Sequence, residues 1–103
     1  MSRAEALFLK IGKEVPGVKE GKMFGSLCLK TPGGKAAAML WKDDLVVKLP
    51  KQELEKALLL QGAKFFEPMD NRPMKEWVQI PAAHSVEWAR LIRDSVAYVN
   101  SLK

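Results

Sequence analysis

Two turn signals in the middle of the chain limit what the sequence can fold into. Pro32-Gly33-Gly34 and Asp43-Asp44 enclose an alanine-rich segment, residues 35–42, whose alanine, methionine and leucine residues favour a helix by propensity alone. The eight residues of this segment are few for a helix, and short apolar runs bounded by turns are typical of strands. We therefore predict three consecutive antiparallel strands over residues 23–31, 35–42 and 45–49, with a type II turn at Pro32-Gly33.

Three other segments have the periodicity of amphipathic helices. Apolar residues recur at three- and four-residue steps over residues 3–14, where Ser2 is placed as the N-cap and Glu5 completes a possible capping box. The same spacing predicts a short helix over residues 51–61 and a long one over residues 84–101.

The remaining apolar runs, residues 65–69 and 76–80, predict two further strands joined by a polar loop over residues 70–73. The element order α-β-β-β-α-β-β-α is an α+β fold, an antiparallel sheet with flanking helices. With 103 residues in all, we expect a single domain over residues 1–103.

Several predicted strands carry apolar residues at both parities, so both faces of the sheet need to be covered. Either a helix packs on each face, or the uncovered face meets a second copy or another protein.

The charge balance permits a polyanionic partner. Seventeen lysines and arginines against twelve acids give a formal charge of +5, with most of the excess in the first third of the chain. There Lys22, Lys30 and Lys35 flank the first predicted hairpin, so they are candidate nucleic-acid contacts. Lysines on exposed edge strands also prevent edge-to-edge aggregation, which is the alternative interpretation of the same residues.

The residues that carry catalytic chemistry are scarce. Cys28 falls in an apolar strand, where a free cysteine usually behaves as a small buried hydrophobe, and His84 stands at the start of the last predicted helix. We expect no catalytic pair, no metal and no cofactor from them. No apolar run approaches the roughly 18 residues of a membrane-spanning helix, and the N-terminus lacks the apolar core of a secretory signal, so we expect a cytoplasmic protein that binds no membrane.

Several stretches together resemble the N-terminal domain of the TfoX/Sxy family. They are Met23-Phe24-Gly25, the strand 45–49, the short helix that ends at Gly62, and above all residues 66–78, which include Phe66-Glu67-Pro68-Met69 and Arg72-Pro73-Met74-Lys75-Glu76. The resemblance implies an α+β fold of the secretion-chaperone-like kind. Members of that family are bacterial regulators of natural competence that act with the cyclic-AMP receptor protein and carry a second, C-terminal domain. The resemblance implies a non-enzymatic regulatory or protein-interaction module. Direct nucleic-acid binding through the basic first third of the chain is the alternative function, and a small enzyme that uses Cys28 and His84 is a remote one.

Three basic residues are candidates for a recognition surface. Arg72 and Lys75 lie in or beside the polar loop that carries the family likeness. Lys48 interrupts an apolar strand and, by period-two alternation, lies on the face opposite Leu45 and Val47. In the structural alternative, Lys48 faces solvent and Arg72 ties back to one of the acids Glu67, Asp70 and Glu76.

Overall fold

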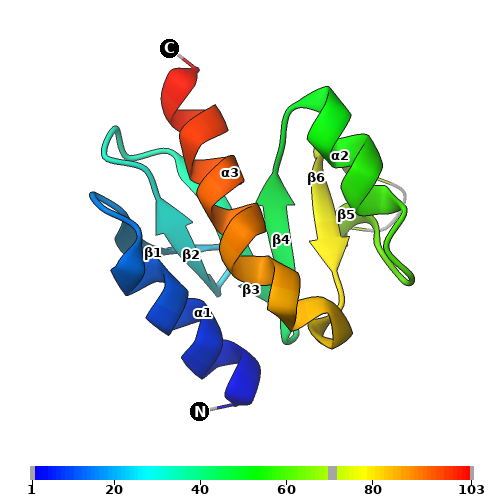
Figure 1. Cartoon of the computed structure of the whole chain (residues 1–103), viewed down its shortest axis with the longest axis horizontal. Helices are drawn as coiled ribbons and strands as arrows, with labels where there is room; N and C mark the ends of the chain where they lie inside the picture. Colours follow the sequence, from blue (N-terminus) through cyan, green and yellow to red (C-terminus); the bar gives the residue numbers. More distant parts are fainter. Residues whose placement is uncertain (1, 70–71, 103) are drawn as a thin grey trace.

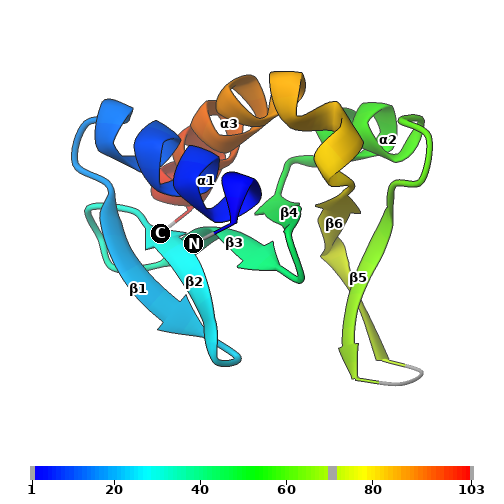
Figure 2. The ribbon, with the colours of Figure 1, turned by 90° about the horizontal axis from the view of Figure 1, so that it is seen from below.

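The computed structural model describes residues 2–69 and 72–102. Six strands form one antiparallel sheet in the order β1-β2-β3-β4-β6-β5, and the helices described lie on one face of it (Figures 1 and 2). The α+β class predicted from the sequence is confirmed, with one strand more than expected. In chain order the elements are α1 (Arg3–Glu14), β1 (Lys19–Met23), β2 (Ser26–Lys30), β3 (Ala36–Trp41), β4 (Asp44–Lys48), α2 (Lys51–Leu58), β5 (Lys64–Met69), β6 (Arg72–Ile80), the 3₁₀ helix η1 (Ala82–Glu87) and α3 (Trp88–Ser101).

The first helix begins and ends as predicted. The Ser2 hydroxyl oxygen accepts a hydrogen bond from the Glu5 N–H at 3.1 Å, which is one half of the expected capping box. Phe8 and Ile11 are buried against the sheet, and Gly12 lies so close to Leu29 of β2 that a Cβ there would come within 2.7 Å of the leucine side chain.

The additional strand is β1, which lies before the predicted strand 23–31 except for Met23 and is separated from β2 by a tight turn. Met23 pairs with Ser26, and the two residues between them have positive φ angles, +53° at Phe24 and +76° at Gly25. Positive φ at both central positions is the signature of a type I′ turn, the commonest connection of a two-residue hairpin. Asn-Gly is the usual sequence signal for that turn, and Phe-Gly is not, which explains why the sequence did not predict it.

The type II turn predicted at Pro32-Gly33 is wrong. Gly34 has the positive φ, +86°, and Gly33 does not. The Gly34 N–H donates to the carbonyl of Thr31 at 2.8 Å, and the Thr31 N–H donates to the carbonyl of Lys35, also at 2.8 Å. A tight turn followed by one left-handed residue is the usual geometry of a slightly longer hairpin loop, and glycine takes that left-handed position without strain.

Three other boundaries differ from the prediction. β6 begins at Arg72, so the last two residues of the predicted polar loop belong to a strand, while Asp70 and Asn71 lie outside the described residues. α2 ends at Leu58, and bonds of the tighter i→i−3 kind follow it, such as Leu60 N–H to the Ala57 carbonyl at 3.1 Å. The last predicted helix is divided into η1 and α3.

The main core lies between the sheet and the helices. Ser95 of α3 is fully buried in it, and its hydroxyl donates to the carbonyl of Ala37 at 2.5 Å. Ala37 is the bulged residue of β3, because Leu29 pairs with Ala38 and Lys30 pairs with Ala36. The helix thus supplies a hydrogen bond that the irregular ladder does not.

Candidate functional site

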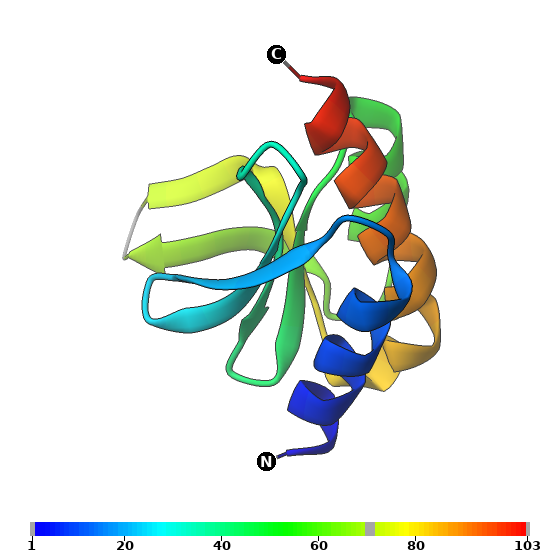
Figure 3. The same cartoon turned by 90° about the vertical axis from the view of Figure 1, so that its left-hand side faces the viewer.

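The face of the sheet turned away from the helices, which we call the open face, carries a second apolar cluster. Cys28, Met39, Val46 and Phe66 are fully buried there, and Trp77 is 8% exposed. No described helix covers this face. Instead, the β1–β2 and β5–β6 hairpins project beyond the sheet on this side, away from the helices (Figures 2 and 3). The sequence predicted that either a helix or another protein chain covers this face. In the described residues no helix does so, and side chains from the two hairpins bury the cluster in part.

Phe24 joins the two hairpins. It sits at the tip of the β1–β2 turn, and its ring centroid lies 6.3 Å from that of Phe66 in β5, with the rings tilted by 54°. Phe24 is nevertheless 53% exposed. A bulky residue with positive φ is strained, so this phenylalanine is held at an exposed tip in a conformation that asparagine or glycine would adopt more easily.

Trp41 is a partly exposed residue that also packs against this cluster. The Trp41 and Phe66 rings meet edge to face at 5.3 Å, and the ammonium group of Lys42 lies 5.7 Å from the centre of the Trp41 ring. Met23 and Met74 are partly buried neighbours of the same cluster. We call the partly exposed residues of this surface the aromatic patch: Met23, Phe24, Trp41 and Met74.

Lys48 lies on the open face, as its alternation with Leu45 and Val47 predicted. Those two residues are buried in the helix-side core, whereas Lys48 pairs with Trp77 of the open-face cluster. Its ammonium group is 3.6 Å from a carboxylate oxygen of Glu76, and its side chain is 22% exposed. Ion pairs at the protein surface contribute about 1 kcal/mol or less, so the Lys48–Glu76 pair adds little to the stability of the fold.

The other two recognition candidates, Lys75 and Arg72, both belong to β6. Lys75 is exposed on β6, next to Met74 of the aromatic patch in sequence. Arg72 begins β6, and its side chain lies outside the described part of the structure, so its predicted partners remain a prediction.

The three candidate nucleic-acid lysines do not share one face. Lys22 pairs with Leu27, which packs on the helix side of the sheet, whereas Lys30 pairs with Ala36 on the open face. Lys35 follows the Thr31 turn, and its ammonium group donates to the carbonyl of Leu102 at 3.2 Å. The structure thus distributes these cations over two faces and a loop.

Cys28 and His84 lie on different sides of the sheet. Burial raises the pKa of the Cys28 thiol above its ordinary value, more than the neighbouring Lys30 ammonium lowers it, and a protonated buried thiol is a poor nucleophile. His84 is in η1 on the helix side, where Nε2 lies 2.8 Å from the carbonyl oxygen of Gln61. In residues 2–69 and 72–102 no three His, Cys, Asp or Glu side chains are grouped as a metal site would need.

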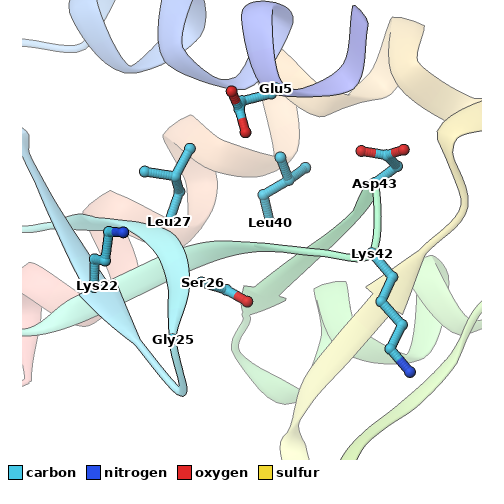
Figure 4. Close-up of a pocket in the computed structure, with 8 residues that line it drawn as sticks. All are labelled: Glu5, Lys22, Gly25, Ser26, Leu27, Leu40, Lys42 and Asp43. Atoms are coloured by element: carbon cyan, nitrogen blue, oxygen red, sulfur yellow. The ribbon is translucent and has the colours of Figure 1, made fainter. Parts of the chain in front are cut away.

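A polar pocket of about 270 Å³ opens on the helix side of the sheet, between the start of α1 and two hairpin turns (Figure 4). The carboxylates of Glu5 and Asp43 lie near its α1 side, and Lys22 lines it from β1. The Ser2 hydroxyl donates to Asp43 at 2.9 Å, so one of the two acids already ties the helix start to the β3–β4 turn. Figure 4 shows Lys42 extending away from the acids. The pocket therefore lies where the start of α1 is tied to the β3–β4 turn.

Comparisons with protein-family models, with characterised proteins and with solved structures find no match for this chain. None of the described helices has the length and apolar character needed to span a membrane.

Proposed function

We propose that this domain is a non-enzymatic interaction module of the kind that the TfoX/Sxy resemblance implies, and that it binds a protein partner through the aromatic patch. The single observation that carries the proposal is Phe24, a strained phenylalanine held 53% exposed at the tip of a hairpin. Strained conformations persist mainly where the surrounding structure or a function requires them.

The chemistry of the patch supports a protein partner. Aromatic side chains and methionine are enriched in protein interfaces, and binding energy concentrates in a few such anchors. Phe24 and Trp41 both rest on the buried ring of Phe66, which restrains them before a partner arrives. A restrained anchor loses less conformational entropy on binding than a free one.

Direct nucleic-acid binding, the alternative, receives less support from the same surface. Bases stack on open aromatic faces, but Lys42 lies over the ring of Trp41, and the Phe24 ring is tilted against Phe66. Lys22 and Lys30 lie on opposite faces of the sheet, so they do not form one phosphate-binding track.

The test is affinity capture from a lysate of the source organism with three versions of the domain. Phe24→Asn removes the ring and keeps the turn, whereas Leu59→Asn removes an 85% exposed apolar side chain after α2 on the helix side as a matched control. We expect a protein that the wild type and Leu59→Asn retain and Phe24→Asn loses. Identical captured proteins with all three versions would remove the aromatic patch from the proposal. Fluorescence anisotropy with a mixed-sequence duplex over a range of salt tests the alternative, since binding through phosphates weakens steeply with salt.

A further inference from the structure

β1 is an edge strand whose outer side is free. It pairs with β2 alone, and among the described residues no strand lies beyond it in the sheet (Figure 2). The residues that flank a two-residue hairpin turn exchange hydrogen bonds with each other, so Met23 bonds to Ser26, and every second residue back along β1 also bonds inward. Glu20 and Lys22 alternate along β1 with these inward-bonding residues. Their backbone N–H and C=O groups therefore point to the open edge, and in the described residues no hydrogen bond from another element reaches them.

The opposite edge is much less suited to pairing. β5 shows two register irregularities against β6, after Phe65 and after Phe66. Its sequence also contains Pro68, which has no N–H to donate. Bulges and proline are the usual means by which proteins prevent pairing at a sheet edge. β1 has neither, and its register with β2 is regular over all five of its residues.

The charges on β1 select one way in which two copies can pair. Glu20 and Lys22 are both exposed, and their side chains point to the same face of the sheet. In an antiparallel pair of β1 strands, outward-bonding residues must lie opposite outward-bonding residues. Two identical copies are related by a twofold axis, or dyad, that crosses the paired strands at one residue. A dyad at Glu20 places Glu20 of one copy opposite Glu20 of the other, and a dyad at Lys22 places Lys22 opposite Lys22. A dyad at Gly21 sets Glu20 of each copy opposite Lys22 of the other, and cross-strand pairs of opposite charge are stabilising where like charges are not.

We propose that a second copy of this chain adds to β1 in antiparallel orientation with the dyad at Gly21, which joins two six-stranded sheets into one continuous sheet. The two Glu20–Lys22 pairs exchange backbone hydrogen bonds and place an acid against a base on both sides of the dyad. Gly21 faces Gly21 of the other copy, in a non-hydrogen-bonded pair where the two backbones approach most closely and a residue without a side chain fits best. The contact is isologous and closed, so it stops at a dimer.

Two charge reversals test this register. Glu20→Lys sets lysine against lysine, and Lys22→Glu sets glutamate against glutamate, at exposed positions whose side chains form no ion pair in the described residues. Sedimentation equilibrium over a concentration series measures self-association, and circular dichroism confirms that each variant is folded. We expect a reversible wild-type dimer that each single variant weakens by about tenfold or more.

Mixing the variants gives the decisive result. An equimolar mixture of Glu20→Lys and Lys22→Glu chains places opposite charges on both sides of the dyad again, so we expect it to dimerise where each variant alone does not. The double variant Glu20→Lys/Lys22→Glu is expected to dimerise as the wild type does. A general charge effect is excluded by design, because the first reversal raises the net charge from +5 to +7 and the second lowers it to +3, and both are expected to weaken the dimer. Lys64→Glu on β5 is the control for a reversal at the other edge.

Three results would overturn the proposal. They are a wild-type chain that stays monomeric at about millimolar concentration, a dimer that neither single variant weakens, and a mixture that fails to recover the dimer. The proposal is independent of the aromatic patch, since Phe24→Asn is expected to leave self-association unchanged.

Discussion

Replacing Phe24 in two ways separates the strain of its turn from the contacts of its ring. Phe24→Ala and Phe24→Asn both remove the ring, but only asparagine is comfortable with a φ of +53° at the first position of this turn. The difference in the free energy of unfolding between the two variants therefore reports the strain alone.

The structure gives the expected size of each effect. Full burial of a phenylalanine side chain contributes about 1.5–3 kcal/mol. Because Phe24 is 53% exposed, removal of its ring loses about half of that contribution. The tilted pair with Phe66 adds about 0.5–1.5 kcal/mol. Phe24→Ala should thus lower the free energy of unfolding by about 2 kcal/mol. Phe24→Asn should lower it by about 1 kcal/mol, because relief of the left-handed strain returns about 1 kcal/mol.

Urea unfolding followed by far-UV circular dichroism measures both values, and thermal unfolding gives a second estimate. For a domain of this size, 1 kcal/mol corresponds to a difference of about 4–8 °C in Tm. If alanine and asparagine unfold at the same urea concentration, the turn is not strained and the argument for a functional Phe24 fails. If Phe24→Ala is as stable as the wild type, the contact with Phe66 contributes nothing.

Two further predictions follow from buried groups. Ser95→Ala removes the donor to the Ala37 carbonyl and leaves that buried oxygen unsatisfied, so we expect the free energy of unfolding, measured in urea, to fall by about 1–3 kcal/mol. The control is Ser101→Ala, whose exposed hydroxyl bonds only to its own helix, and we expect it to lower the free energy of unfolding by less than about 0.5 kcal/mol. For Cys28, burial raises the pKa of the thiol in the folded state above 9.0, so the folded state holds the thiol proton more tightly than the unfolded state does. The contribution of this thiol to the free energy of unfolding is therefore fully present below pH 9 and is lost as the pH rises above 9. The urea midpoint of the wild type should therefore fall more steeply above pH 9 than that of Cys28→Ala, and a parallel decline of the two would contradict the assignment.

Local signals were enough to predict most of the elements. The N-cap at Ser2 and the periodicity after it predicted α1 at its observed bounds. The two turn signals around residues 36–41 correctly favoured a strand over the helix that alanine and leucine prefer, because the segment is too short to bury a helical face. The class of the fold followed from this one decision.

The residues that sequence reasoning missed depend on contacts between distant segments. Nothing in the sequence near Phe24 indicates that Phe66, 42 positions later, will support its ring, and the turn that exposes Phe24 lacks its usual asparagine. The apolar parities of β3 and β4 did predict that both faces of the sheet need covering. That two hairpins would supply part of the cover depends on the curvature of the sheet, which alternation does not encode.

The order of the strands has a consequence for how the chain folds. In the described sheet, each neighbouring pair but β4–β6 joins strands that follow one another in sequence. The first four strands can therefore form by closing short loops, and β5 and β6 can form a separate hairpin. At the β4–β6 seam, Leu45 pairs with Ile80, so this step closes a long loop that contains α2 and β5. Because long-range pairing is the slow part of folding, we expect the folding rate to depend on residues of this seam more than on those of either hairpin.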